Sequence, residues 1–278
     1  MNPRARFLLY QICRFGALNA KQMLEICDGY YKKTNLYRRL SILEKEKLIT
    51  NLSRTVGDGA IIGPTPKALR QVFGENYNDM IPLRERDLDH AGKVVDVLTA
   101  LGKYEFVTGV ATEHELTARE RSEFSLNKVP DGIIQITRGD SKYELAVEVE
   151  TSSKNSFLIS ESLASYERTL ARKMQCAGVI YVCCDQNIYN SFRAKIEKLP
   201  PEIERRVVLI QLNEINQLEE RFYGRLGMRP NQGLNYMRNS SPMGIKYFPI
   251  ISREDEFKSL LKGGHYSTHT RNNNEVKV

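Results

Sequence analysis

Residues 143–150 read Tyr-Glu-Leu-Ala-Val-Glu-Val-Glu, and this stretch decides the fold expected for the centre of the chain. Apolar and polar side chains alternate along it, which is the pattern of a β-strand. One face would carry apolar groups and the other mostly carboxylates: Leu145, Val147 and Val149 against Glu144, Ala146, Glu148 and Glu150. Neighbouring carboxylates on an interior strand are costly to bury unless a cation neutralises them. The stretch therefore predicts a core strand and raises the question of a bound cation.

A second strand is expected just before it, over residues 130–137, and the turn Arg138-Gly139-Asp140 separates the two. If the two strands pair as a hairpin, Asp131 at the start of the first lies beside Glu148 on the second. Two carboxylates with a carbonyl and waters are a typical Mg²⁺ site. A metal held there could polarise a phosphodiester and generate hydroxide.

The elements around this hairpin predict an α/β (α+β) fold with the order αβββαβαβ from residue 88 onward. The first strand, 106–116, contains Glu113 and Glu115 as possible further ligands, and residues 117–128 are expected to form a loop or a partly helical excursion. The apolar run 179–184 fits a buried strand. The remaining expected elements are helices at 88–101, 160–173 and 187–199 and a last strand at 207–212.

The N-terminal part has a different character, with two helices expected within residues 6–26 and a third from Thr34 to Lys47. Thr34 is the expected N-cap, and Leu36, Leu40 and Leu43 form the core stripe of the third helix. The turn Gly57-Asp58-Gly59 then predicts a β-hairpin, and a short helix follows at 67–73.

Charge separates the same parts of the chain. Residues 1–74 carry a formal charge of +8, residues 75–215 carry −5 and residues 216–278 carry +4. A basic N-terminal unit favours a nucleic-acid partner, with a protein-interaction unit whose basic face is merely solvated as the alternative. The candidate DNA-contacting residues lie in or near the third helix, except for one in the hairpin: Lys32, Lys33, Asn35, Arg38, Arg39, Lys45 and Arg54.

Three resemblances follow from these motifs. The stretch LYRRLSILEKEKLI (36–49) with the following hairpin resembles winged helix-turn-helix proteins. Pro130-Asp131 and Glu148-Val149-Glu150 within an αβββαβ order resemble the PD-(D/E)XK nuclease-like superfamily. The combination, together with HAGKVVDVL (90–98), resembles the replication-relaxation family of plasmid and mobile-element proteins, which implies binding at an origin of transfer or replication.

The nuclease-like resemblance implies site roles for four residues. Asp131 and Glu148 would bind Mg²⁺ or Mn²⁺, and Lys154 would steady the scissile phosphate. Glu150 stands where the superfamily has its Lys and would assist the metal or water. This departure from the pattern leaves an inactive nuclease fold, kept for DNA binding or dimerisation, as the alternative.

The sequence thus predicts a winged helix-turn-helix domain over 1–76, a PD-(D/E)XK-like domain over 77–215 and an extension with a disordered tail over 216–278. The expected function is a double-stranded-DNA-binding relaxosome accessory protein, with a relaxase or replication initiator and a second copy of the chain as possible partners. The rivals are a non-enzymatic transcriptional regulator and a stand-alone restriction-type endonuclease. An odd number of cysteines and the absence of a signal peptide or membrane span suggest the cytoplasm.

Overall fold

A computed structural model describes residues 1–27, 31–55, 59–74, 83, 87–118, 129–138, 141–171 and 176–218. The turn expected at 57–58, the boundary expected between residues 76 and 77, and the extension from residue 219 onward therefore lie outside the described residues.

The N-terminal part consists of three helices, a hairpin and a fourth helix: α1 Pro3–Phe15, α2 Ala20–Ile26, α3 Lys33–Lys45, β1 Ile49–Thr55, β2 Gly59–Pro64 and α4 Pro66–Phe73. Most of these helices begin at a side-chain cap. Asn19 and Gln22 form a reciprocal capping box at α2, and Thr65 accepts a hydrogen bond from Ala68 N at α4. Gly16 ends α1 with φ of 74°, where a side chain would be strained. The predicted succession of helices and hairpin is confirmed.

One detail of this part was predicted wrongly. Thr34 is not the cap of α3, because the helix begins one residue earlier and its N-cap is Lys32, which makes no side-chain cap. The apolar stripe is as expected, with Leu36 and Leu43 fully buried.

The second part is built on a five-stranded mixed sheet in the order β3-β4-β5-β6-β7. The strands are β3 Val107–Thr112, β4 Gly132–Arg138, β5 Ser141–Glu150, β6 Cys176–Cys183 and β7 Val207–Gln211. β3, β4 and β5 pair antiparallel, whereas β5, β6 and β7 pair parallel. The helices are α5 Leu88–Gly102, α6 Glu113–Ala118, α7 Ser156–Ala171, α8 Gln186–Ile196 and α9 Pro201–Glu204, and a 3₁₀ helix follows at Leu212–Gln217.

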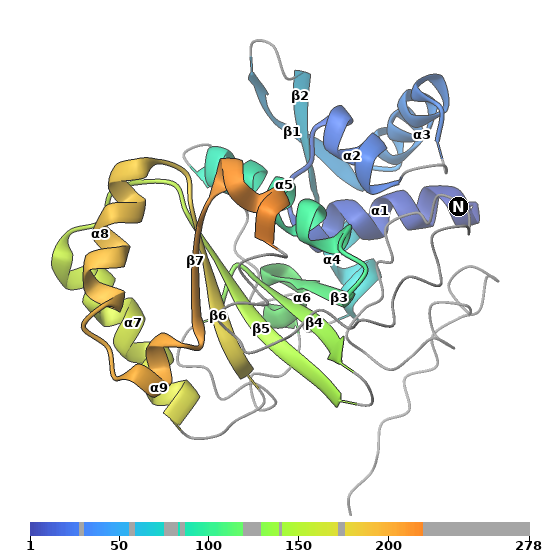
Figure 1. The fold of residues 1–278 in the computed structure, drawn as a ribbon. Coiled ribbons are helices and arrows are strands. Elements are labelled where there is room, and N and C mark those ends of the chain that lie inside the picture. The colour runs from blue at the N-terminus through green and yellow to red at the C-terminus, as the bar shows by residue number, and fades with distance from the viewer. Residues whose placement is uncertain are drawn as a thin grey trace, which may run out of the picture.

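Helices cover both faces of this sheet (Figure 1). Alternation along the strands sends one set of side chains, including Val147 and Ile180, into a core shared with α5 and the N-terminal helices. The opposite set, including Ala146 and Tyr181, packs against α7 and α8. The protein is therefore a mixed α/β structure with one layer of helices on each side of the sheet.

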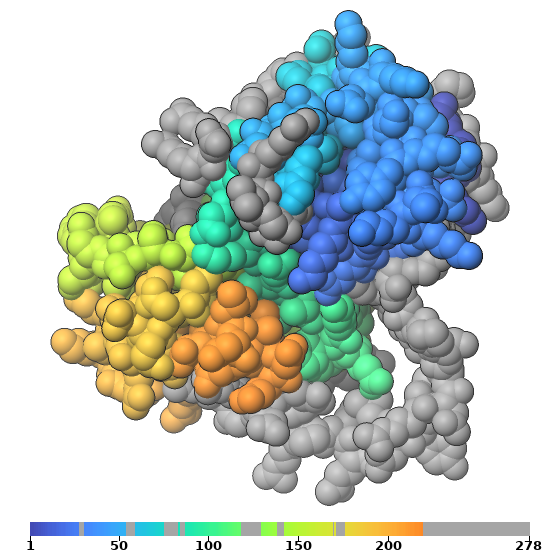
Figure 2. All heavy atoms as spheres, turned by 90° about the horizontal axis from the view of Figure 1, so that it is seen from above, coloured from blue at the N-terminus to red at the C-terminus, as the bar shows by residue number. Residues whose placement is uncertain are grey.

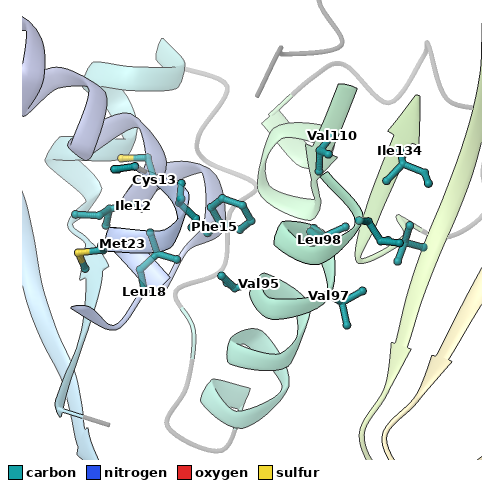
Figure 3. Packing of buried hydrophobic residues seen from close by; sticks show 14 of the residues in the cluster. Ile12, Cys13, Phe15, Leu18, Met23, Val95, Val97, Leu98, Val110 and Ile134 are labelled. Carbon is teal, nitrogen blue, oxygen red and sulfur yellow. The ribbon is translucent and has the colours of Figure 1, made fainter. Parts of the chain in front are cut away.

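The two parts share one hydrophobic core. Ile12, Phe15 and Met23 belong to the same buried cluster as Val95 and Leu98 of α5 and as the strands. Figure 3 shows α5 between the N-terminal helices and the strands. Figure 2 shows the green α5 region between the blue N-terminal elements and the yellow and orange elements that follow later in the chain. The position of the N-terminal helices relative to the sheet is thus set by close packing.

A buried ion pair lies in this shared interface. Arg14 of α1 donates from Nε to Glu115 of α6 at 2.7 Å, and the two side chains are 1% and 6% exposed. Tyr10 Oη also donates to Glu115, at 2.7 Å, and Arg14 donates to the carbonyl of Val110. Removing either charge would leave the other buried without its partner, which is strongly destabilising.

The prediction of one strand over 106–116 was wrong in its second half. β3 ends at Thr112, and α6 begins at Glu113. Thr112 and Glu115 form the reciprocal bonds of a capping box: Thr112 N donates to Glu115 Oε2 at 3.0 Å and Glu115 N donates to Thr112 Oγ1 at 3.4 Å. This local bonding, and the Arg14 partner of Glu115, remove Glu115 from any role as a ligand beside Glu148.

Candidate functional site

The outer face of α3 gathers exposed cationic and polar side chains. Helix α3 packs against α1, α2 and β1, which covers its Leu36 and Leu43 side. In Figure 1 it lies at the margin of the molecule away from the five-stranded sheet. The predicted DNA-contacting residues of this segment are exposed except for half-buried Arg39: Lys32, Lys33, Asn35, Arg38 and Lys45.

The two ends of α3 differ in charge. From Lys32 to Ile42 the segment contains no carboxylate, whereas Glu44 and Glu46 follow at the C-terminal end. Among the residues that the structure describes, the side chains of Arg38 and Arg39 form no hydrogen bond or ion pair. The N-terminal half of the helix is therefore a cationic surface with side chains available to an external anion.

Tyr37 belongs to the same surface, although the sequence reasoning did not select it. Its exposed fraction of 49% is high for a large aromatic residue, and it lies between Leu36, which is buried, and Arg38, which is exposed. The signal that could have found it is helical spacing, because Thr34, Tyr37, Arg38 and Ser41 fall on one side of a 3.6-residue period. Arg54, the predicted contact in the hairpin, pairs through its backbone with Ala60.

The second candidate site lies at the end of the sheet where β4 begins and β5 ends. The pairing of the two strands ends at Gly132 with Val147, so Asp131 lies just before the paired part of β4, near Glu148 and Val149 of β5. Asp131 Oδ2 accepts a hydrogen bond of 2.7 Å from Val149 N, and its Oδ1 lies 3.3 Å from His90 Nε2. Asp131 is therefore held between strand β5 and helix α5.

Glu148 and Glu150 are both 2% exposed, and each has its own partner. Tyr166 Oη of α7 donates to Glu148 Oε1 at 2.6 Å, and burial together with this carboxylate holds the pKa of Tyr166 well above its usual range. Lys154, which precedes α7, donates to both oxygens of Glu150, at 2.8 and 2.7 Å. The structure thus brings together Lys154 and Glu150, two of the four residues that the nuclease-like resemblance singled out.

His90 belongs to this site, although the sequence analysis did not select it as a site residue. It stands in the first turn of α5, whose N-cap is Asp87, and its side chain is 38% exposed. The bond to Asp131 raises the pKa of His90, partial burial opposes the rise, and the nearby charges of Asp131, Glu113 and Glu150 add to it. The only sequence signal was the position of a histidine at the start of a core helix, which does not specify a partner 41 residues away.

Most carboxylate oxygens of this site already have a partner in the protein. Both oxygens of Asp131 and of Glu150, and one oxygen of Glu148, already have a protein donor. Throughout the part of the chain that the structure describes, no three His, Cys, Asp or Glu side chains stand close enough to hold one ion together. A lysine ammonium on Glu150 also repels a second cation.

Within the described residues, no helix has the length and apolar character needed to cross a membrane.

No protein-family model and no curated protein matches the chain. Among solved structures, the restriction endonuclease FokI bound to DNA gives a TM-score of 0.27 at 10% identity, covering 81% of this chain and 45% of that chain. FokI without DNA gives 0.25 at 9% identity with the same coverage. The chain thus spans less than half of the FokI chain, and TM-scores this low do not establish a shared fold.

Proposed function

We propose that the protein binds double-stranded DNA, with α3 in the major groove and the β1–β2 hairpin against the neighbouring backbone, as in a winged helix-turn-helix domain. The observation that carries this proposal is the exposed, carboxylate-free N-terminal half of α3. A helix fits the major groove, recognition helices contact bases through their N-terminal residues, and exposed Arg and Lys neutralise phosphates.

The test is the salt dependence of duplex binding. The double variant Arg38→Ala with Arg39→Ala should weaken binding and reduce the slope of log affinity against log salt by up to about 2, because each lost phosphate contact removes about 0.9. A matched control is Lys195→Ala with Lys198→Ala at and just after the end of α8, where Lys198 is exposed and Lys195 is half-buried, like Arg38 and Arg39. If both double variants reduce the slope equally, α3 is not the DNA-contacting helix.

For the second part we propose a PD-(D/E)XK-like unit that serves as a scaffold in a plasmid-mobilisation or replication complex. The resemblance to the replication-relaxation family supports this role and suggests a relaxase or replication initiator as the partner and a homodimer as a possible assembly. The contact of Asp131 with Val149 N, next to Glu148 on β5, supports the nuclease-like relationship. Co-purification with a relaxase on origin-containing DNA would test the role, since a transcriptional regulator alone would not recruit one.

A metal-dependent endonuclease is the second candidate function, with Asp131, Glu148, Glu150 and Lys154 as its site. The contact of Lys154 with Glu150 is the observation that favours it, because it puts a cation where the superfamily pattern has a lysine. Nicking of supercoiled DNA with Mn²⁺, and its loss in Asp131→Ala with duplex binding retained, would support this candidate. No nicking with either Mg²⁺ or Mn²⁺ would leave the scaffold role.

A further inference from the structure

We infer that the carboxylates at the end of the sheet fasten the helices of both layers to strands β4 and β5 and do not act as metal ligands. The inference concerns the second part alone. It stands whether or not α3 binds DNA, and it separates the scaffold from the endonuclease candidate.

Asp131 fastens α5. Its two oxygens face different partners, the backbone N–H of Val149 on the adjacent strand and the ring of His90 in the first turn of the helix. The Asp131 carboxylate therefore adds a hydrogen bond to β5 at the end of the β4–β5 pairing. It also connects the strands to α5, the helix on the face of the sheet that packs against the N-terminal helices. Its side chain is only 14% exposed, so water replaces these contacts poorly when they are lost.

Glu148 and Glu150 fasten α7 on the opposite face. Tyr166, in the third turn of the helix, reaches Glu148, and Lys154, two residues before the helix begins, reaches Glu150. The two carboxylates alternate with Val149, which packs in the core on the α5 side. The two glutamates at the end of β5 thus both connect the strand to α7. Glu148 contacts the helix itself, and Glu150 contacts the segment that leads into it.

Burial makes these contacts matter. Burying a charged carboxylate that is only 2% exposed costs free energy unless hydrogen-bond donors surround it. Lys154 places a positive charge in direct contact with Glu150. Tyr166 supplies a hydroxyl donor that is itself buried. Lys154 and Tyr166 thus stabilise the two carboxylates for which the sequence pattern raised the question of a bound cation.

The two roles predict opposite signs for a stability measurement. Carboxylates gathered to hold a metal repel one another when the metal is removed, so neutralising one of them raises the thermal midpoint in a chelating buffer. Carboxylates that fasten helices lower the midpoint when they are removed, because their donors lose a partner. The experiment is therefore thermal unfolding of the full chain in EDTA and with millimolar Mn²⁺.

For the wild type we expect the same midpoint in EDTA and in Mn²⁺. A bound ion would instead raise the midpoint by several degrees at concentrations well above its dissociation constant. This comparison needs no variant, so it decides the question even if substitutions at the sheet end prevent folding. A saturable upward shift with Mn²⁺ would overturn the inference.

For variants we expect Asp131→Ala to lower the midpoint by roughly 5 °C in EDTA, with Asp131→Asn between it and the wild type since the amide oxygen still accepts from Val149 N. Glu150→Gln and Lys154→Met should each lower the midpoint, and the double variant should lose less than the sum, as contacting partners do. Glu202→Gln, at an exposed position of α9, is the control and should change nothing. A rise in midpoint for Asp131→Asn or Glu150→Gln would contradict the inference.

Discussion

The outer face of α3 and the end of the sheet both gather charged side chains, but the two regions use them differently. The cations of α3 are directed to solvent and, within the described residues, Arg38 and Arg39 have no partner in the protein. The carboxylates of the sheet end are nearly or fully buried, and His90, Tyr166 and Lys154 each hold one of them.

The two regions therefore differ in whether their charged groups can bind an external ion. Those of α3 have no partner in the protein among the described residues, whereas those of the sheet end are already paired within it. An exposed cation without a partner can contact a phosphate without breaking a bond in the protein, and release of the counterions condensed on the nucleic acid favours that contact. A buried carboxylate with a donor must first give up that donor before it can bind anything else. Charge counted along a sequence does not make this distinction, and the −5 of residues 75–215 is a sum over both kinds.

The largest effect is expected at the buried ion pair between the two parts. Glu115→Ala leaves the Arg14 guanidinium, 1% exposed, without its counter-charge and should reduce the free energy of unfolding by about 3–5 kcal/mol in urea denaturation. The exposed pair Lys103–Glu25 also joins the two parts, and Glu25→Ala should cost less than about 1 kcal/mol. Equal losses in the two variants would mean that burial does not decide the use of charge here.

The next effect tests a single contact of the sheet end. Tyr166→Phe removes the hydroxyl that donates to Glu148 and keeps the ring that packs beside Tyr181. We expect a loss of about 1–3 kcal/mol in the free energy of unfolding, because a buried carboxylate loses a donor. Tyr189→Phe, on α8 and only half-buried, is the matched control. An unchanged stability for Tyr166→Phe would show that Glu148 is not held by α7.

A smaller effect is expected for the uncharged member of the α3 surface. Tyr37→Ala should weaken duplex binding several-fold, about 1 kcal/mol, and leave its salt slope unchanged because no phosphate is neutralised by the phenol. Binding to a random-sequence duplex pool, followed by sequencing of the bound fraction, measures whether a base preference is lost as well. A change in slope would place Tyr37 among the side chains that position the phosphates.

The smallest effect concerns a buried histidine near the interface. His114 lies against Gly16, bonds the carbonyl of Cys13 through Nδ1, and has its pKa lowered from 6.5 by burial. Because the unfolded chain then binds a proton at a higher pH than the folded chain, the contribution of His114 to stability should fall as the pH drops below about 6.5. Chemical unfolding from pH 7 to pH 5 should show this fall in the wild type and a flatter profile in His114→Gln. The same profile in both would assign acid sensitivity to other groups.

Sequence patterns predicted the elements whose signals are local. The alternation in 143–150, the leucine stripe of α3 and the turn residues of the hairpin all act within a few residues, and the structure confirms the elements they indicate. The capping box of Thr112 and Glu115 is equally local, but the apolar run before it favoured a longer strand. The T-x-x-E pattern of Thr112 and Glu115 is typical of a helix start, and it would have predicted α6.

The contacts of the candidate site could be predicted only in part. The register of β4 and β5 follows from a short hairpin, so the position of Asp131 near the end of β5 was predictable. The partners of these carboxylates come from α5 and α7, and the partner of Glu115 is 101 residues away. Such pairs depend on how layers pack, and hydrophobic periodicity says which face of a helix is buried but not what it meets.

The shared core of α1, α2 and α5 has a consequence for how this protein can change its target. A DNA-reading unit on a flexible linker can be exchanged whole between proteins, because its own core is closed. Here Ile12 and Phe15 pack in one cluster with Val95 and Leu98, so an exchanged unit would have to reproduce that surface and the Arg14–Glu115 pair. If α3 contacts DNA as proposed, a change of target would be confined to substitutions on its outer face, where Tyr37 and Arg38 are exposed and can vary without disturbing the core.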